Sequence, residues 1–311
     1  MKLYIADAFT DELFGGNPAG VVIFENDEDF PDDEIMRKTA AELRYSETAF
    51  IKQLSEKEFQ IRYFTPADEV DLCGHATIAS FSCLLDAGLV SDGENYINHT
   101  LAGTLNISIN DGFVVMDMAV PEYIGTISES TDITELFDVM GMPYVPVEAK
   151  NINGEDVHLL PMMISTGLPD IIMPVPDRAF LEEISPDFER LSQLSWKKNV
   201  VGVHAFTLDS SEDGITAHCR NFAPLYDIDE EAATGTSNGA LTYYLYKNGI
   251  IKPDCNCAFI QGEAMKRPSK ILSFPSNCED SSTEKDGNSS AKVNIRVGGK
   301  AIVLAKGTIL L

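Results

Sequence analysis

Residues 62–66 read RYFTP and residues 74–90 read GHATIASFSCLLDAGLV. A related pair occurs later in the chain, RNFAP at 220–224 and GTSNGALTYYLYKNGII at 235–251. Both copies run from a strand-like segment through a proline and an acidic loop to a glycine that opens a helix, and a second glycine follows each helix. The matched positions keep their order with only a short insertion. We therefore infer an internal duplication, and we expect two similar halves.

The bulk composition limits the class of protein. The 311 residues are 44% hydrophobic, which suits a folded chain of about two ordinary domains. With 23 Lys+Arg against 49 Asp+Glu, the net charge is −26, which disfavours binding to nucleic acid or to anionic membranes. Asp7 interrupts the segment where a signal peptide would need an apolar core, and six scattered cysteines suit a reducing compartment. We expect a soluble, cytoplasmic protein.

The duplication and the turn signals divide the chain. We place an N-terminal lobe at residues 1–120, a C-terminal lobe at 121–298, and a terminal strand at 299–311 that can join the sheet of the first lobe. Asp111-Gly112, between two alternating runs, predicts a tight β-hairpin.

Two further segments of the second half are predicted from composition. Residues 180–194 predict an acidic helix, because helix formers follow an acidic start. Residues 276–290 are polar and low in complexity, which predicts a solvated loop.

The two duplicated helices share one chemical property. A helix N-terminus offers unpaired N–H groups and the positive end of the helix dipole, so it can hold a carboxylate or phosphate without a charged side chain. Gly74 and Gly235 would let such an anion approach the backbone. The simpler interpretation is that each glycine only permits a tight turn, but its recurrence favours two anion-holding helix starts.

Cys73 and His75 allow two other interpretations. A metal site would need more ligands, and residues two apart seldom share a helical face, so we predict no metal. A nucleophilic Cys73 at a helix N-terminus is possible because the dipole lowers a thiol pKa, yet no catalytic triad can be recognised in the sequence. Thr234 occupies the matching position in the second copy, so the thiol is not a shared feature.

Proton transfer by a carboxylate is the remaining interpretation. Glu47 stands at the end of an otherwise apolar strand, SETAFI, where burial would raise a carboxyl pKa and make the group a usable acid and base. A structural role for Glu47 is equally compatible with the sequence.

Four ordered segments resemble a known family: DAFTDELFGGNPAGVV, SETAFI, YFTPADEVDLCGHATIAS and RNFAPLYDIDEEAATGTSNGAL. Together they resemble the PhzF-like proteins of phenazine biosynthesis, relatives of diaminopimelate epimerase. The resemblance implies an α+β fold of two pseudo-symmetric lobes, each with a mixed or antiparallel sheet wrapped around a central helix, and a site between the lobes. It also implies isomerisation without a cofactor, usually in a homodimer.

The family's functional positions are carried over residue by residue. The resemblance implies catalytic roles for Glu47, His75, Glu231 and Thr236, and substrate-binding roles for Asn17, Cys73, Gly74, Thr234 and Gly235. Glu231 and Thr236 stand where the family pattern has Asp and Ser. Both functional groups are kept but pocket size changes, which counts against the phenazine precursor itself as substrate.

These observations lead to one expected function and two alternatives. We expect an isomerase that moves a proton within a small carboxylate-bearing, amino-acid-like metabolite by acid/base catalysis at Glu47. A racemase or epimerase that uses Cys73 is one alternative, although a threonine hydroxyl at position 234 is a poor second base near neutrality. A binding or scaffold protein without catalysis is the other.

Overall fold

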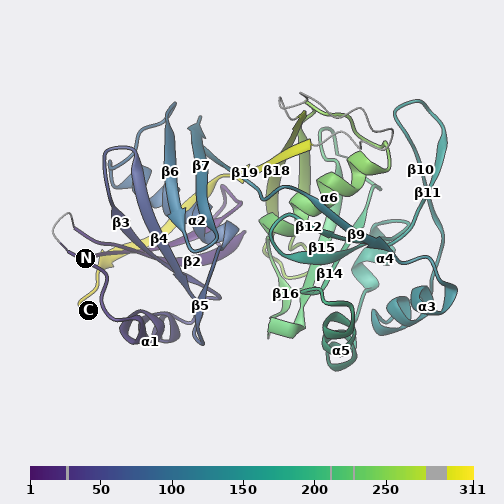
Figure 1. The fold of residues 1–311 in the computed structure, drawn as a ribbon, viewed down its shortest axis with the longest axis horizontal. Coiled ribbons are helices and arrows are strands. Elements are labelled where there is room, and N and C mark those ends of the chain that lie inside the picture. The colour runs from purple at the N-terminus through teal and green to yellow at the C-terminus, as the bar shows by residue number, and fades with distance from the viewer. Residues whose placement is uncertain (26–27, 211, 227, 278–292) are drawn as a thin grey trace, which may run out of the picture. The chain divides into compact units, whose positions relative to one another are not determined.

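The structure is a computed structural model that describes residues 1–25, 28–210, 212–226, 228–277 and 293–311 (Figure 1). Its contacts divide the chain into two compact units. The first comprises Met1–Asp117, Lys266–Lys270 and Gly298–Leu311, and the second comprises Met118–Met265 and Ile271–Val297. The chain therefore enters the first unit, builds the second, and ends in the first.

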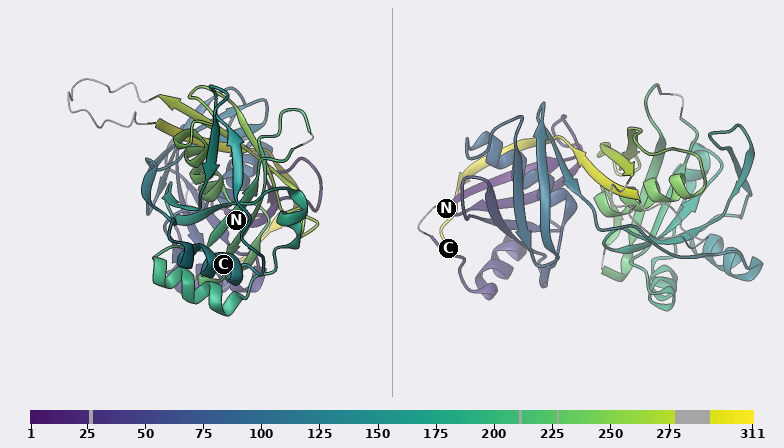
Figure 2. Two further views of the ribbon diagram at one scale, coloured as in Figure 1. Left: turned by 90° about the vertical axis from the view of Figure 1, so that its right-hand side faces the viewer. Right: turned by 45° about the horizontal axis from the view of Figure 1, so that its top comes forward.

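The first unit is a curved sheet around one helix. Its strands are β1 (Lys2–Ala8), β2 (Asn17–Ile23), β3 (Thr48–Gln53), β4 (Glu58–Phe64), β5 (Glu69–Val70), β6 (Asn95–Thr100), β7 (Gly103–Asn110), β8 (Phe113–Asp117) and β20 (Ala301–Thr308), and its helices are α1 (Asp33–Leu43) and α2 (Gly74–Asp86). Helix α2 contacts β1, β2, β3, β8 and β20. The last strand, yellow in Figures 1 and 2, runs antiparallel beside the purple β1.

Burial explains why α2 forms the centre of this unit. Its side chains are buried on every face, from Ala76 through Ile78 and Phe81 to Leu84. A helix that is apolar all round is stable only inside a structure, so the sheet has to curl around it. Helix α1 packs on the outer face instead, where Met36 and Ala40 meet the side chains of β2, β3 and β4.

The second unit repeats this architecture. Its strands are β9 (Glu122–Thr126), β12 (Met162–Ser165), β13 (Pro169–Pro174), β14 (Val203–Thr207), β15 (Ala217–Ala223), β16 (Ile228–Glu231), β17 (Cys257–Gln261), β18 (Ser269–Asn277) and β19 (Val293–Gly299), with a separate hairpin of β10 (Val147–Lys150) and β11 (Asp156–Leu159). Its helices are α3 (Ser130–Val139), α4 (Arg178–Glu183), α5 (Phe188–Lys198) and α6 (Gly235–Lys247), and a 3-10 turn spans Pro224–Tyr226. Helix α6 packs against β12 and β13.

Strand pairing confirms the duplication. In the first unit β1–β2 is antiparallel, β2–β3 parallel, β3–β4 and β4–β5 antiparallel, and β4–β6 parallel. The same scheme links β12–β13, β13–β14, β14–β15, β15–β16 and β15–β17. The repeated arginines also behave alike. Arg62 pairs with Glu69 above the Phe64 ring, and Arg220 pairs with Glu230 above the Phe222 ring.

Local predictions are confirmed at the hairpin and corrected at the acidic helix. Asp111 and Gly112 both have positive φ and join β7 to β8 as expected. The helix expected at 180–194 is two helices, α4 and α5, because Pro186 interrupts the run. Asp187 accepts a hydrogen bond from the Arg190 amide and begins α5. Of the loop expected at 276–290, residues 276 and 277 end β18, and 278–290 lie outside the described residues.

Candidate functional site

The start of α2 positions the principal group of site residues. Cys73 precedes the helix with an extended backbone (φ −136°, ψ 114°), and its side chain makes no capping hydrogen bond to the helix. Gly74 is the first helical residue, and the first turn carries no acidic side chain. The first N–H groups of a helix lack partners within it, so this turn is suited to holding an anion.

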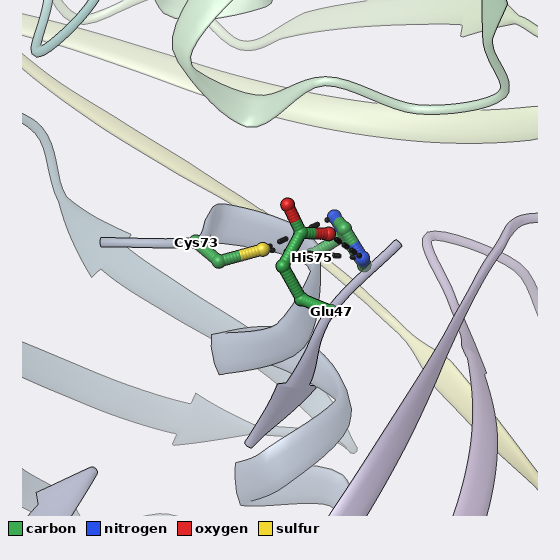
Figure 3. Close-up of side chains that lie close together, drawn as sticks. All are labelled: Glu47, Cys73 and His75. Carbon is green, nitrogen blue, oxygen red and sulfur yellow. Dashed lines mark hydrogen bonds and ion pairs between the residues drawn. The ribbon is translucent and has the colours of Figure 1, made fainter. Parts of the chain in front are cut away.

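Three side chains converge at this helix start (Figure 3). His75 Nε2 lies 3.3 Å from Glu47 Oε2, and His75 Nδ1 lies 3.3 Å from Cys73 Sγ. The Ser46 hydroxyl lies 3.4 Å from His75 Nε2. Glu47 arrives from the residue before β3, where its carbonyl accepts a hydrogen bond from the Gly20 amide of β2. The parallel β2–β3 pair thus fixes the carboxylate beside the imidazole.

Burial controls the electrostatics of this group. His75 is only 3% exposed, and desolvation lowers its pKa, an effect that the Glu47 charge partly offsets. The imidazole is therefore neutral near pH 7 and carries one ring proton. With that proton on Nε2, the ring faces Glu47 as a donor and faces the Cys73 thiol as an acceptor.

Glu47 has one unsatisfied oxygen. Its Oε2 is buried and makes no hydrogen bond, although it lies within ion-pair distance of His75. A buried carboxylate oxygen without a hydrogen bond costs free energy, so its retention suggests a purpose other than stability. The carboxylate is therefore the group of this cluster best suited to accept a proton.

The same three residues are the only cluster of at least three metal-type ligand atoms in the described part of the chain, with all three atoms within 4.8 Å of one another. The carboxylate and the thiol lie nearest to opposite ring nitrogens, whereas one ion can bond to only one of them. A chain Glu47–His75–Cys73 fits proton movement better than tetrahedral metal binding. The prediction of no metal stays a prediction.

One argument from spacing was wrong. We expected residues 73 and 75 not to share a helical face, but the Cys73 thiol reaches His75. The reason is that Cys73 is not helical. Its extended backbone turns the side chain toward the ring of the second helical residue.

A buried hydrogen-bond chain holds the first turn of α2. The Asn98 amide donates to the Tyr63 hydroxyl (3.0 Å), which contacts the Thr77 hydroxyl (2.7 Å), and Thr77 donates to the Cys73 carbonyl (2.7 Å). Asn98 Oδ1 makes no hydrogen bond, but the three bonds form a continuous link from β6 through β4 to the residue before α2. The backbone that presents Gly74 and His75 is fixed in this way.

The start of α6 has a matching backbone and different chemistry. Thr234 precedes the helix with φ −131° and ψ 106°, close to the values at Cys73. Its hydroxyl donates to Glu231 Oε2 at 2.5 Å and accepts from the Gln261 amide at 3.1 Å. Gln261 also donates to the Glu231 carbonyl (2.7 Å). The second unit therefore holds its carboxylate through a hydroxyl rather than beside an imidazole.

Two further contacts fix the first turn of α6. The Asn238 amide donates to the Thr234 carbonyl at 2.9 Å, the counterpart of the Thr77 bond to Cys73. The Ser237 hydroxyl donates to buried Asp170 at 2.5 Å, and burial raises the pKa of Asp170 to about 6.

The expected site residues thus fall into groups within each unit. The first unit brings together Glu47, Cys73 and His75 at Gly74, and the second brings together Glu231 and Thr234 at Gly235. The Thr236 carbonyl accepts from the Thr166 hydroxyl at 2.8 Å. Asn17 begins β2, is buried, and pairs with Ala8 of β1.

Sequence reasoning missed Ser46, Gln261 and Asp170. Ser46 is adjacent to Glu47 in the sequence and could have been found from that position. Gln261 and Asp170 carry no motif, and they are recognised only through contacts with residues 27 and 67 positions away.

Proteins with similar sequences and structures show to which class this protein belongs. A protein of Clostridium acetobutylicum named an uncharacterized isomerase is 31% identical over 325 residues, covering 100% of this chain and 98% of that protein. A crystal structure of a Bacillus anthracis phenazine biosynthesis protein of the PhzF family superposes with a TM-score of 0.82 at 25% identity, covering 100% of this chain and 99% of the other. The protein is an isomerase of the PhzF and epimerase-like fold.

The particular family follows from its sequence profile. The phenazine biosynthesis-like protein family matches residues 6–307, and the chain belongs to it. A human phenazine biosynthesis-like domain-containing protein is 31% identical over 257 residues, which cover 78% of this chain and 83% of the human protein. A probable proline racemase of Agrobacterium radiobacter shares the fold, with a TM-score of 0.64 at 12% identity over 100% of this chain and 93% of that one. None of the helices in the described ranges is long and apolar enough to cross a membrane.

Proposed function

We propose that this isomerase moves a proton within a small carboxylate-bearing, amino-acid-like metabolite without a cofactor, and that Glu47 is its acid and base. The observation that carries the proposal is the buried Oε2 of Glu47, which has no hydrogen bond. It lies beside a neutral imidazole, at the start of a helix whose first turn has no acidic side chain. A group with this environment can remove a proton from carbon and hold it long enough for exchange with solvent before it is returned.

The proton balance of the proposed reaction is simple. Glu47 takes a proton from one carbon, and the electron pair left behind spreads toward the substrate carboxyl group. The amides at Gly74 and His75 stabilise the developing negative charge, since the dipole of α2 favours an anion there. Glu47 then returns the proton to a second position, and no oxidant or reductant is needed.

His75 has a supporting role in this proposal. Its neutral ring lies beside the Glu47 carboxylate, with Nε2 3.3 Å from Oε2, and adds no positive charge there. For Glu231, Thr234, Gly235, Thr236 and Asn17 we propose the substrate-orienting and substrate-binding roles that the family resemblance implies. The Thr234 hydroxyl supports this because it fixes the direction of the Glu231 carboxylate.

Replacement of Glu47 tests the proposal directly. In deuterium oxide a true substrate should acquire deuterium at carbon, and E47Q should reduce this exchange by at least about a hundredfold, since a positioned acid/base supplies 10²–10⁴. The control E42Q makes the same change at an exposed position of α1. Exchange retained by folded E47Q would refute the assignment.

A racemase that uses Cys73 is the second candidate, because the thiol lies 3.3 Å from His75 Nδ1 and the imidazole can accept its proton. C73A separates the two reactions. Under the Glu47 proposal we expect deuterium exchange within about threefold of wild type, since the thiol contacts the His75 ring but takes no proton from the substrate. A loss comparable to that of E47Q would establish the thiol as the base.

We also propose that the protein acts in the cytoplasm as a homodimer. Sedimentation equilibrium should give a particle of about twice the 34.1 kDa chain mass. A monomer at micromolar concentration would contradict this.

A further inference from the structure

Cys255 and Cys257 form a pair of thiols in the second unit that the proposed isomerisation does not use. Their sulfur atoms lie 3.7 Å apart. Cys255 is half-buried in the turn before β17, and Cys257 is the buried first residue of that strand. The thiols of Cys73, Cys83 and Cys219 are buried.

Backbone hydrogen bonds on both sides hold the turn that brings the two thiols together. The Asp254 amide donates to the Pro275 carbonyl at 2.7 Å. After the pair, the Ala258 amide donates to the Thr216 hydroxyl at 3.1 Å, and the Thr216 amide donates to the Ala258 carbonyl at 2.7 Å. The backbone on both sides of the pair is therefore held by neighbouring strands, and the side chains need only rotate to bring the sulfur atoms together.

The environments of the two thiols assign them different roles. Burial, together with a smaller effect of the neighbouring Cys255, raises the pKa of Cys257 to about 12. A buried thiol of this kind reacts slowly with a reagent from solution. Cys255 is the accessible partner, so a reagent reaches Cys255 first, and Cys257 reacts only with a group already attached there.

We propose that Cys255 and Cys257 are a reversible dithiol–disulfide site that exchanges with low-molecular-weight disulfides. The Cys255 thiolate attacks one sulfur of the reagent, a mixed disulfide forms, and one thiol leaves. Cys257 then loses its proton to solvent, attacks the Cys255 sulfur, and expels the second thiol. The protein loses two protons and two electrons, and one disulfide is reduced to two thiols.

Proximity compensates for the weak acidity of Cys257. Reacting groups held in place can behave as if present at very high concentration, which offsets a small thiolate fraction. A disulfide bond of about 2.05 Å requires the sulfur atoms to approach further, a movement that side-chain rotation can supply. The proposal is independent of the isomerase mechanism, because none of these atoms belongs to the group around Glu47.

Hydroxyethyl disulfide is a suitable probe because it is uncharged, so the net charge of the chain does not repel it. The full-length protein should carry C278S, since Cys278 lies outside the described residues and could react independently. After incubation at pH 8, we expect the mass to fall by two hydrogens, with Cys255 and Cys257 linked in one peptide. Dithiothreitol should restore the original mass.

Two variants in the same background assign the roles. C257S should stop at a stable mixed disulfide on Cys255, and C255S should react at least tenfold more slowly than the C278S protein. Accumulation of the mixed disulfide with Cys257 present would overturn the proposal, as would equal reactivity of C255S. Failure of either pair member to react would overturn it as well.

Discussion

At the scale of single residues, His75 determines how the side chains of Glu47 and Cys73 interact. The ring lies between Glu47 and Cys73, each against a different nitrogen. The duplicated position holds Thr236, and there the carboxylate Glu231 is held by the Thr234 hydroxyl instead. The two halves share a backbone and differ in their proton chemistry, so duplication preserved the helix start while the side chains diverged.

A residue-scale prediction concerns Asp170, whose pKa burial raises to about 6. The folded protein therefore binds a proton between about pH 4 and 6 that the unfolded chain has released, so this group lowers stability as the pH rises through that range. At pH 7 the cost is roughly 3 kcal/mol, from about two pKa units. D170N keeps a hydrogen-bond acceptor for Ser237 and removes the ionisation.

Urea unfolding between pH 4 and 7 tests this expectation, followed by fluorescence of Trp196, which lies in α5 of the second unit. The stability of D170N relative to wild type should rise between pH 4 and 6 and then level off. D156N, at an exposed position of β11, serves as a control and should show no such rise. A constant difference between D170N and wild type would contradict the assignment.

At the scale of elements, the residue before each of the two central helices is held in the same way. Its carbonyl accepts a hydrogen bond from a side chain four positions later in the helix. Thr77 bonds the Cys73 carbonyl, and Asn238 bonds the Thr234 carbonyl. We predict that T77V lowers kcat/KM at least tenfold, since the amides of Gly74 and His75 lose their fixed direction. It should also cost about 1–3 kcal/mol, because Tyr63 loses a buried hydrogen-bond partner.

T39V is the matched control for this prediction. Thr39 is buried in α1 of the same unit, and its hydroxyl donates to the Ile35 carbonyl at 2.8 Å, again four positions back. Both variants should be less stable in urea, but only T77V should lose activity in the exchange assay. Equal activity losses would mean that the effect is general destabilisation.

Element predictions succeeded where the signal was local. Asp111-Gly112 specifies its hairpin because both residues accept positive φ. Residues 180–194 were misread because helix-forming composition was given more weight than Pro186, which cannot continue a hydrogen-bonded turn. Gln261 could not have been found from its own element, because the sequence of β17 is that of an ordinary apolar strand. Only the pairing of β17 with β15 in the folded sheet brings Gln261 beside Thr234.

At the scale of the whole molecule, the net charge of −26 should oppose the capture of an anionic substrate. We predict that kcat/KM for a carboxylate substrate rises about two- to fivefold as sodium chloride increases from 10 to 300 mM, because salt screens the repulsion. A substrate with the carboxylate replaced by a neutral amide should show little change. A fall in kcat/KM with salt would indicate that local positive potential dominates capture.

The sequence by itself determined the duplication, the helix starts and the family, because these depend on glycines, prolines and hydrophobic periods that act over a few residues. It also identified Glu47 and His75 as candidates through the resemblance. Only the tertiary structure decided that Cys73 reaches His75, that Glu47 keeps a buried oxygen without a hydrogen bond, and that Cys255 and Cys257 lie 3.7 Å apart. Such features depend on backbone direction at single residues and on strand pairing between distant segments, which residue spacing does not encode.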